Sequence, residues 1–207
     1  MMTPRTKEQN EIIRIRRIAQ IVKAAADVYL DKGVLMEIRD VAASADLGYG
    51  TVYHYYKNKT DLLHDVLWQA MERAAVEMAE LVNSDIVASA NQSSYTGWGS
   101  RLLKLWARDH GLYLLCQLGG DHFRSLPEQF AGALTVAYHE NVLRPVSAMI
   151  EYRQEQEIKE AGVSPPRQAE LLLAALTGCA LLPLRRGTLH TEAEQIAHFL
   201  FEGRGIS

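Results

Sequence analysis

Cysteine is scarce in this chain. Its two copies, Cys116 and Cys179, form no CxxC pair. Two separated cysteines do not make a disulfide framework or a thiolate zinc site, and such sparing use fits a reducing compartment. The first ten residues are polar, with no apolar stretch typical of a signal peptide, so we expect a cytoplasmic protein.

A long hydrophobic run is missing as well. The longest apolar stretch covers residues 171–184, about 14 residues, whereas a bilayer span needs about 20. The sequence therefore predicts no membrane partner. It also lacks the sustained alternation of apolar and polar residues that is typical of strands. Since 48% of the residues are hydrophobic, a large core is possible, and the sequence predicts an all-α fold.

Residue sets that carry out catalysis are lacking too. We find no nucleophile–base pair, no glycine-rich phosphate loop and no metal-ligand cluster. His110, His122 and His139 are scattered, without the spacing of metal ligands. We therefore expect no enzyme, no metal site and no cofactor.

The chain has no strong charge of one sign, but its charge is uneven. Residues 1–60 hold 10 Lys and Arg against 7 Asp and Glu, while residues 61–207 hold 12 against 18. A basic first third on an acidic remainder suits a DNA-reading head on a body that avoids DNA. By charge alone, an unevenly charged solvated surface is an equally good explanation.

Three helical stretches with short breaks stand near the N-terminus. The first is expected at about 8–32, ending at Gly33 in a left-handed C-cap. Two short helices follow at about 37–44 and 48–55, separated by a tight break. Two short helices joined in this way form a helix-turn-helix, whose second helix fits the DNA major groove. The apolar stripe of the first helix comprises Ile15, Ile18, Ala19, Val22, Ala25, Ala26 and Tyr29.

The rest of the chain also reads as helical. Residues 83–97 are expected to form a polar loop. We divide the chain into a helix-turn-helix DNA-binding domain, residues 1–58, and a helical ligand-binding and dimerisation domain, residues 59–207. The body helices are expected from the cap Asn58–Asp61 to about 82, at about 98–118, from a start at Leu126–Pro127, at about 134–160 with a bend near Pro145, at about 166–186, and from a Thr191–Glu194 capping box to Gly203.

The N-terminal residues resemble a known family. The matching positions are Gly33, Arg39–Ala42, Gly50–Tyr56, Asn58–Lys59 and Leu62–Leu63. They resemble the N-terminal signature of the TetR family of bacterial transcriptional regulators, over about residues 14–64. The resemblance implies a ligand-responsive DNA-binding regulator, a repressor that a small molecule releases from a palindromic DNA operator.

This chain departs from the family pattern at the breaks between helices. Asp46 stands where the turn usually has glycine, although aspartate tolerates the left-handed conformation. Gly48 replaces a serine or threonine cap, and it is an acceptable cap. Met36–Glu37 replaces a capping threonine before the second helix. These changes leave the scaffold in place but bear on helix boundaries and base preference.

The chemistry of individual side chains gives the candidate DNA contacts their roles. Gly50 permits close approach to the sugar-phosphate chain. Tyr49 and His54 are the candidates for reading bases. Lys59, in the first turn of its helix, is placed to clamp a phosphate. Tyr56, by contrast, is expected in the core. The full candidate set is Arg39, Gly48, Tyr49, Gly50, Thr51, Tyr53, His54 and Lys59.

The resemblance implies that the C-terminal domain binds a small-molecule effector and pairs two subunits. The candidate ligand-binding residues are Trp98, Trp106, Asp109, Tyr113, Tyr138 and Asn141. For any single aromatic member, ordinary core packing is the better explanation. Asp109 falls on the apolar side of the expected helix 98–118. Two explanations stay open: the carboxylate meets a partner such as Arg108, Arg144 or a ligand cation, or it lies at the edge of the apolar stripe.

The last two helices are expected to form the homodimer face, because their apolar surfaces exceed what one small body covers. A rival interpretation remains open. In it, the chain is a small-molecule-binding, all-helical carrier without sequence-specific DNA binding. The two differ in whether the protein prefers one DNA sequence over another.

Overall fold

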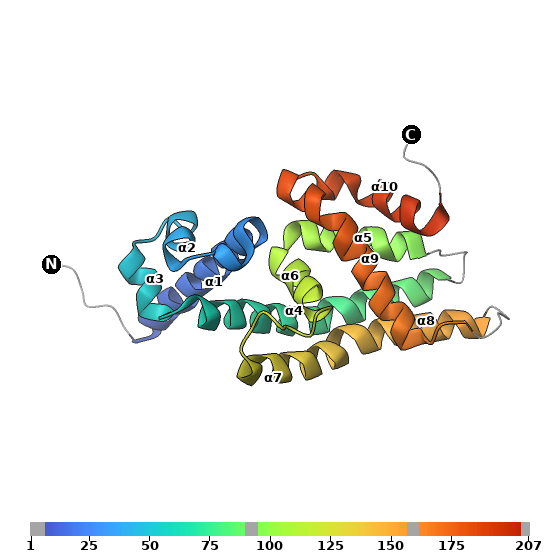
Figure 1. The fold of residues 1–207 in the computed structure, drawn as a ribbon, viewed down its shortest axis with the longest axis horizontal. Coiled ribbons are helices and arrows are strands. Elements are labelled where there is room, and N and C mark those ends of the chain that lie inside the picture. The colour runs from blue at the N-terminus through green and yellow to red at the C-terminus, as the bar shows by residue number, and fades with distance from the viewer. Residues whose placement is uncertain (1–6, 90–94, 157–161, 204–207) are drawn as a thin grey trace. The chain divides into compact units, whose positions relative to one another are not determined.

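The computed structural model describes residues 7–89, 95–156 and 162–203, without the side chains of 85–89 and 156. Within these ranges every regular element is helical, which confirms the all-α prediction (Figure 1). The chain divides into two compact units, Met1–Val66 and Leu67–Ser207. One helix, α4 (Lys59–Ser89), contributes to both units. The domain boundary after residue 58 stays a prediction.

The N-terminal unit begins with α1 (Lys7–Lys32), the 3₁₀ turn η1 (Gly33–Leu35), α2 (Ile38–Ser44) and α3 (Tyr49–Tyr55). Their ends follow the local signals in the sequence. Gly33 has a φ of +57° and Asp46 a φ of +51°, so both adopt the left-handed backbone expected of them. Gly48 is the N-cap of α3 in an extended conformation, as predicted.

The core of this unit is built against the second half of α1. Val22, Ala25, Ala26 and Tyr29 are buried there as the stripe predicts, together with residues of the short helices such as Val41 and Val52. The stripe is wrong in its first part, because Ile15 and Ala19 are exposed and Ile18 is only half-buried. Buried positions in α1 begin at Ile21. An i, i+3, i+4 pattern shows which face of a helix is apolar. It does not show how much of the helix length the neighbouring helices cover.

The predicted polar loop 83–97 is wrong at both ends. Helix α4 continues to Ser89, and α5 (Tyr95–Arg108) begins before the predicted start. Asn83 and Ser84 lie on the exposed side of α4, where polar residues do not oppose a helix. Residues 90–94, in the middle of the predicted loop, lie outside the described residues.

The predicted helix 98–118 is two helices, α5 and α6 (His110–Gly119). Between them Asp109 is extended, with φ −133° and ψ 94°. Its carboxylate accepts from the backbone N–H groups of Gly111 and Leu112. Aspartate is among the best N-cap residues, because its oxygen pairs with N–H groups that the first turn leaves unpaired. The break is therefore a capped helix start.

The helix predicted to start at Leu126–Pro127 is confirmed, since Pro127 is the N-cap of α7 (Glu128–Tyr138). The long helix predicted at 134–160 is wrong, because its residues fall in three segments. They are α7, the π-helical segment η2 (His139–Leu143) and α8 (Arg144–Gln156). In place of the bend predicted near Pro145, the structure has the π-helical segment η2 just before this proline. Proline has no N–H to donate to the preceding turn, and a π turn is one way a helix accommodates such a gap. The last predicted residues, 157–160, lie outside the described part.

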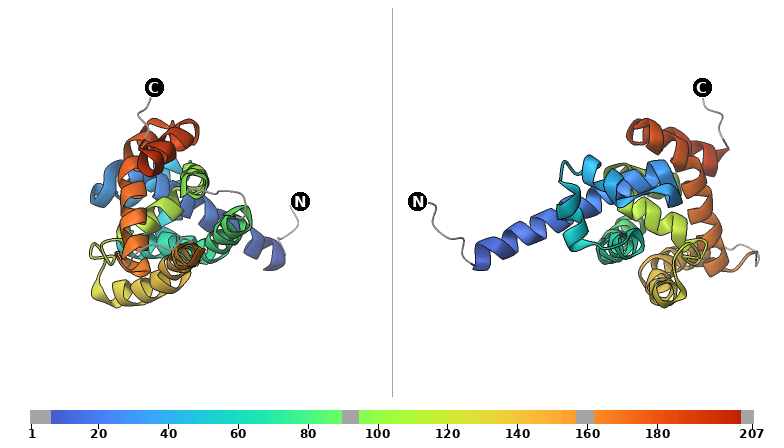
Figure 2. Two further views of the ribbon diagram at one scale, coloured as in Figure 1. Left: turned by 90° about the vertical axis from the view of Figure 1, so that its right-hand side faces the viewer. Right: turned by 60° about the vertical axis from the view of Figure 1, so that its left-hand side comes forward.

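Two helices complete the C-terminal unit, α9 (Pro165–Arg186) and α10 (Leu189–Glu202). Gly203 ends α10 with a φ of +63°, near the predicted place. The Thr191–Glu194 capping box is wrong, because Thr188 is the N-cap and Thr191 lies in the first turn. In this unit α10 packs along α5, and α8 along α9 (Figures 1 and 2).

Among the described residues, α9 is the one helix that is long and apolar enough to cross a membrane by length and composition. The apolar run counted from the sequence was shorter, because it excluded the flanking residues of the helix. A third of its most apolar window is buried inside the protein. A single such helix is weak evidence of a span, since the core helix of a globular protein passes the same test.

Candidate DNA interface and ligand core

Two exposed tyrosines of α3 and a lysine just beyond its end form a ridge, which we call the tyrosine ridge (Tyr49, Tyr53 and Lys57). The rings of Tyr49 and Tyr53 stack with centroids 5.7 Å apart and planes at 20°. The Lys57 ammonium lies 4.7 Å from the centre of the Tyr53 ring and donates to the Tyr53 carbonyl at 2.8 Å. Residues four apart share a helix face. The ridge is 54% exposed at Tyr49 and 43% at Tyr53.

The other candidates on and beside α3 are also accessible. His54 is exposed and meets the Tyr55 ring edge-on at 5.3 Å. A Cβ atom at Gly50 would meet nothing within 4 Å, so the backbone there is open to close approach. Thr51 is half-buried, and Arg39 is exposed on α2. Their contacts with DNA stay predictions.

The opposite side of α3 faces the core. Val52 is fully buried, and Tyr56, which follows the helix, is 8% exposed. The placement of Tyr56 confirms the sequence prediction. Its hydroxyl donates to the carboxylate of Asp65 on α4. Burial and this carboxylate raise the pKa of Tyr56 well above its usual value, so the phenol stays protonated. This link fixes α3 against the start of α4.

Lys59 is held in place within the N-terminal unit. Its ammonium donates to the Val34 carbonyl at 2.9 Å and to a Glu37 carboxylate oxygen at 3.3 Å. An ammonium has three N–H donors, so one remains for a phosphate. The helix start beside it is capped as predicted, since Asn58 accepts from the Asp61 N–H at 2.8 Å. The lysine therefore has a local structural role that the sequence did not show.

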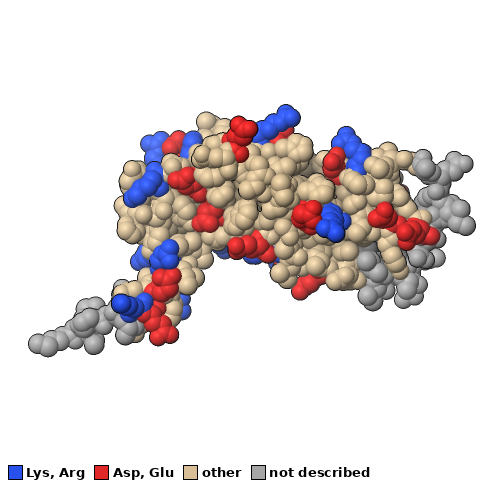
Figure 3. Space-filling view, turned by 90° about the horizontal axis from the view of Figure 1, so that it is seen from below, with Lys and Arg blue, Asp and Glu red and all other residues tan. Residues whose placement is uncertain are grey.

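On the face that Figure 3 draws, charges of one sign do not gather in one place. Basic and acidic side chains are interleaved there on a largely uncharged surface. Within the N-terminal unit, for example, Lys32 pairs with Asp40 at 2.9 Å, and this ion pair lowers the pKa of the carboxyl group. The case for a DNA interface therefore depends on the exposed side chains of α3 and not on a basic patch.

The aromatic ligand candidates of the C-terminal unit are buried in its core. Trp98, Trp106 and Tyr113 are fully buried, and Tyr138 is 3% exposed. The rings of Trp106 and Tyr113 meet edge-on at 5.7 Å. Tyr113 donates to the Thr177 carbonyl on α9 at 3.3 Å, and burial raises its pKa to about 12. The structure is compatible with both sequence interpretations, core packing and ligand lining.

Polar atoms in this core are not all paired. The indole N–H groups of Trp98 and Trp106 are buried and have no hydrogen-bond partner. Trp106 lies beside Cys116, where burial raises the thiol pKa to about 12 and the indole opposes the shift. Sulfur is a weak acceptor, so we treat the indole N–H as unsatisfied. An unpaired buried donor costs about 1–3 kcal/mol, and such groups in native proteins need an explanation.

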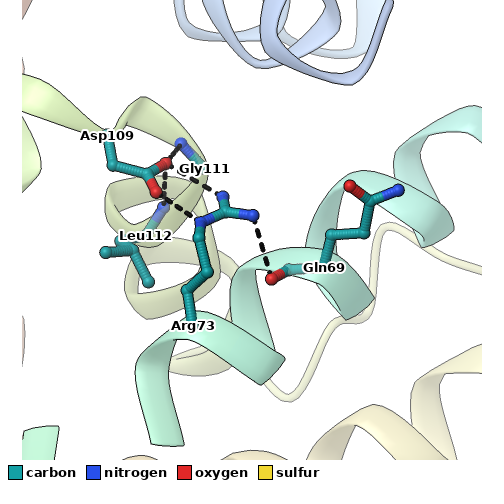
Figure 4. Close-up of polar contacts among 5 residues, drawn as sticks. All are labelled: Gln69, Arg73, Asp109, Gly111 and Leu112. Carbon is teal, nitrogen blue, oxygen red and sulfur yellow. Dashed lines mark hydrogen bonds and ion pairs between the residues drawn. The ribbon is translucent and has the colours of Figure 1, made fainter. Parts of the chain in front are cut away.

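Asp109 does not lie on an apolar helix face, which corrects the sequence interpretation. It stands between two helices with its side chain 26% exposed. Its partner is Arg73 of α4 (Figure 4). Arg73 Nε donates to Asp109 Oδ2 at 2.6 Å, and Nη2 donates to Oδ1 at 3.1 Å. Neither Arg108 nor Arg144 was the right choice, and Arg144 pairs instead with Glu140 at 2.7 Å. A partner 36 positions away has no local sequence signal.

The remaining candidates have plain structural settings. Asn141 is half-buried and donates from its amide nitrogen to the Ala137 carbonyl at 2.9 Å, so part of its polar capacity is already used. In the part of the chain that the structure describes, no group of three or more His, Cys, Asp or Glu side chains is arranged to hold a metal ion.

Comparison with known proteins links the N-terminal helices to a family. A profile described as bacterial regulatory proteins, tetR family, matches residues 21–66, which contain α2, α3 and the start of α4. The fatty acid metabolism regulator protein of Bacillus subtilis (strain 168) is 29% identical over 100 residues, covering 48% of this chain and 50% of that protein. The match thus spans about half the length of this curated relative.

Solved structures share the fold over nearly the whole chain. The MbdR regulator from Azoarcus sp. CIB has a TM-score of 0.66 at 19% identity, with 92% of this chain and 100% of that chain covered. The regulator FadR from Bacillus subtilis, solved with stearoyl-CoA, has a TM-score of 0.56 at 18% identity, covering 90% and 99%. AibR, solved with isovaleryl coenzyme A and operator DNA, has a TM-score of 0.61 at 15% identity, with 89% of this chain and 98% of that chain covered.

Such low identities show the fold alone, whereas the profile matches the helix-turn-helix itself. The matched residues include Gly50 and Lys59, which carried the resemblance in the sequence. The N-terminal helix-turn-helix of this chain therefore matches the tetR family of bacterial regulatory proteins over residues 21–66.

Proposed function

We propose that this protein is a cytoplasmic, homodimeric transcriptional repressor whose hold on operator DNA is released by a small-molecule effector. The observation that carries the proposal is the exposed outer face of α3, the second helix of the matched helix-turn-helix. This helix enters the major groove, and the two copies in a dimer read successive half-sites, with centres about 34–36 Å apart or somewhat more.

The dimer contact of the proposal uses α9 and α10. Leu171, Ala175, Gly178 and Leu182 are all exposed and lie within one narrow stripe along α9, because seven and eleven residues are close to whole numbers of helical turns. Leu171 is 48% and Leu182 57% exposed. A second copy covers this apolar stripe and forms a four-helix bundle with the first.

The effector we propose is an acyl-coenzyme A thioester. FadR was solved with stearoyl-CoA and AibR with isovaleryl coenzyme A, so proteins of this fold accommodate such ligands. In this chain, the apolar core around Trp106 and Tyr113 suits an acyl chain, and an unpaired indole N–H suits its carbonyl oxygen. To release DNA, the effector must bind the released state better, typically by about 1–3 kcal/mol.

A gel-shift titration tests the proposal. The probe is the DNA upstream of the protein's own gene, at a stated salt concentration, with a scrambled duplex as control and stearoyl-CoA or isovaleryl-CoA added. We expect preference for the upstream DNA and weaker binding with a thioester present. A protein that binds a thioester but prefers neither duplex is a carrier, and the proposal fails.

Substitutions in the interface separate backbone contacts from base readout. Lys59→Ala is expected to weaken binding to all sequences, by about fivefold at 0.15 M salt, and to reduce the salt slope by about one unit. Tyr49→Ala or His54→Ala is expected to change base preference by about fivefold at one position of each half-site. Binding to a set of single-base operator variants at several salt concentrations measures both effects.

Arg124→Ala is the matched control, because it removes one exposed charge from the C-terminal unit. It should leave the salt slope within experimental error of the parent protein. An unchanged slope in Lys59→Ala would show that this lysine serves only its contacts with Val34 and Glu37.

The core substitution Trp106→Phe tests the effector site. The change keeps an aromatic ring and removes the N–H donor. Effector affinity should fall about tenfold, the value of one hydrogen bond. Stability should change by less than about 1 kcal/mol, since losing an unpaired buried donor offsets lost ring contacts. Calorimetric titration with stearoyl-CoA and thermal unfolding measure the two quantities. Unchanged affinity at unchanged stability contradicts a ligand role for this indole.

A further inference from the structure

One carboxylate connects two helices of the C-terminal unit. Oxygen Oδ1 of Asp109 accepts from the N–H groups of Gly111 and Leu112 at 3.0 and 3.3 Å and from Arg73 Nη2 at 3.1 Å. Oxygen Oδ2 accepts from Arg73 Nε at 2.6 Å. Figure 4 shows this arrangement, with the Asp109 carboxylate accepting from Arg73 on α4 and from the N–H groups at the start of α6. The same group therefore caps α6 and grips α4.

The arginine is oriented as firmly as the carboxylate. Besides its two bonds to Asp109, its Nη1 donates to the Gln69 carbonyl of its own helix at 3.0 Å. A planar guanidinium that makes two parallel bonds to a carboxylate fixes direction as well as distance. A rotation or an axial shift of either helix therefore breaks some of these hydrogen bonds.

The backbone of α6 comes close to this pair. A Cβ atom at Gly111 would stand 3.0 Å from Arg73 Nη2, 3.0 Å from Asp109 Oδ1 and 3.5 Å from the Ala70 Cβ on α4. Glycine is thus the residue that leaves room for the contact. Side chains on the following turns of α6, Tyr113 and Cys116, belong to the buried core around Trp106.

We infer that Arg73 and Asp109 form a positioning joint that makes the placement of α4 depend on the first turn of α6. The inference rests on the proposed function for its consequence. A ligand that enters the core beside Tyr113 displaces α6, the Asp109 carboxylate moves with it, and α4 follows. Helix α4 runs without a break from Lys59 to Ser89. A displacement at Arg73 is therefore passed along the helix to Lys59, the proposed phosphate contact.

The chain offers a substitution that separates the two jobs of Asp109. In Asp109→Asn the side-chain oxygen still caps α6, because asparagine caps as well as aspartate. The charge and the second acceptor for Arg73 are lost. Arg73→Gln removes the guanidinium that makes the two bonds to Asp109. Arg144→Gln is the matched control, since it removes an arginine–glutamate pair within one helical stretch and joins no second element.

The first readout is the ratio of operator affinities without and with stearoyl-CoA. We expect each single variant to lower this ratio about fivefold. The double variant should lower it no further, because both substitutions break the same contact between Arg73 and Asp109. Stearoyl-CoA affinity and the ratio in Arg144→Gln should stay within twofold of the parent. A parent-like ratio in the single variants, or effects that add in the double variant, would overturn the inference.

The second readout needs no effector, so it separates the joint from the proposed function. Hydrogen exchange of backbone amides near Gln69–Arg73 should become at least threefold faster in Asp109→Asn, while the capped first turn of α6 keeps its protection. Unchanged exchange in α4 overturns the joint whatever the DNA assay shows. Failure of the parent protein to prefer its upstream DNA, with faster exchange in α4, overturns only the proposed function.

Discussion

Gly119→Ala is expected to lower the free energy of unfolding by about 1–3 kcal/mol, the usual cost of inserting a methyl group into a well-packed core. Gly119 is the last residue of α6, and a Cβ atom there would lie 2.7–2.8 Å from three ring atoms of Tyr138. The ring has little room to withdraw, since Tyr138 is 3% exposed and meets Phe123 edge-on at 5.9 Å. Urea unfolding monitored by circular dichroism measures the change.

Gly132→Ala supplies the matched control. Gly132 lies inside α7, is exposed, and would have nothing within 4 Å of a Cβ atom. Alanine is the better helix former by about 0.8–1.0 kcal/mol, so this substitution should stabilise the protein. The two variants thus make the same chemical change with opposite expected signs. Equal effects in both would mean that the α6–α7 contact is not close-packed in solution.

Local signals in the sequence were enough to place most helix ends. Left-handed residues at Gly33 and Asp46, the Asn58 cap and the end near Gly203 were all read from one or two residues and their immediate neighbours. Capping depends on hydrogen bonds within about one turn, so a short window of sequence contains the information. The same locality misleads where two candidates compete, as Thr188 and Thr191 do.

Features that depend on distant residues could not be read in this way. Asp109 pairs with Arg73, which lies 36 positions away in the sequence. The same carboxylate, which the sequence placed on an apolar helix face, is the N-cap of α6. The ties of Lys59 to Val34 and Glu37 likewise join separate segments. For the candidate site, Tyr49 and His54, chosen from the sequence as base-reading residues, are both exposed on α3. It gave no sign of the unpaired indole N–H groups, since hydrogen-bond satisfaction is a property of the packed core.

Leu182→Asp is expected to separate the dimer into single subunits. In the proposed interface this side chain is buried, and an unpaired charge left there costs about 3–5 kcal/mol, roughly 100-fold or more in the dimerisation constant. Operator binding should fall with it, because two linked heads gain about 10²–10⁴-fold over one. Light scattering after gel filtration and a gel-shift titration measure the two effects.

The subunit itself should tolerate Leu182→Asp, since the side chain is already 57% exposed there. The matched control is Val136→Asp on α7, at a valine that is 68% exposed and lies outside the proposed face. That variant should remain dimeric and bind the operator as the parent does. Loss of the dimer in both variants would place the contact elsewhere or indicate unfolding, and circular dichroism tells these apart. A dimer that persists in Leu182→Asp would show that the α9 stripe is covered by something other than a second copy.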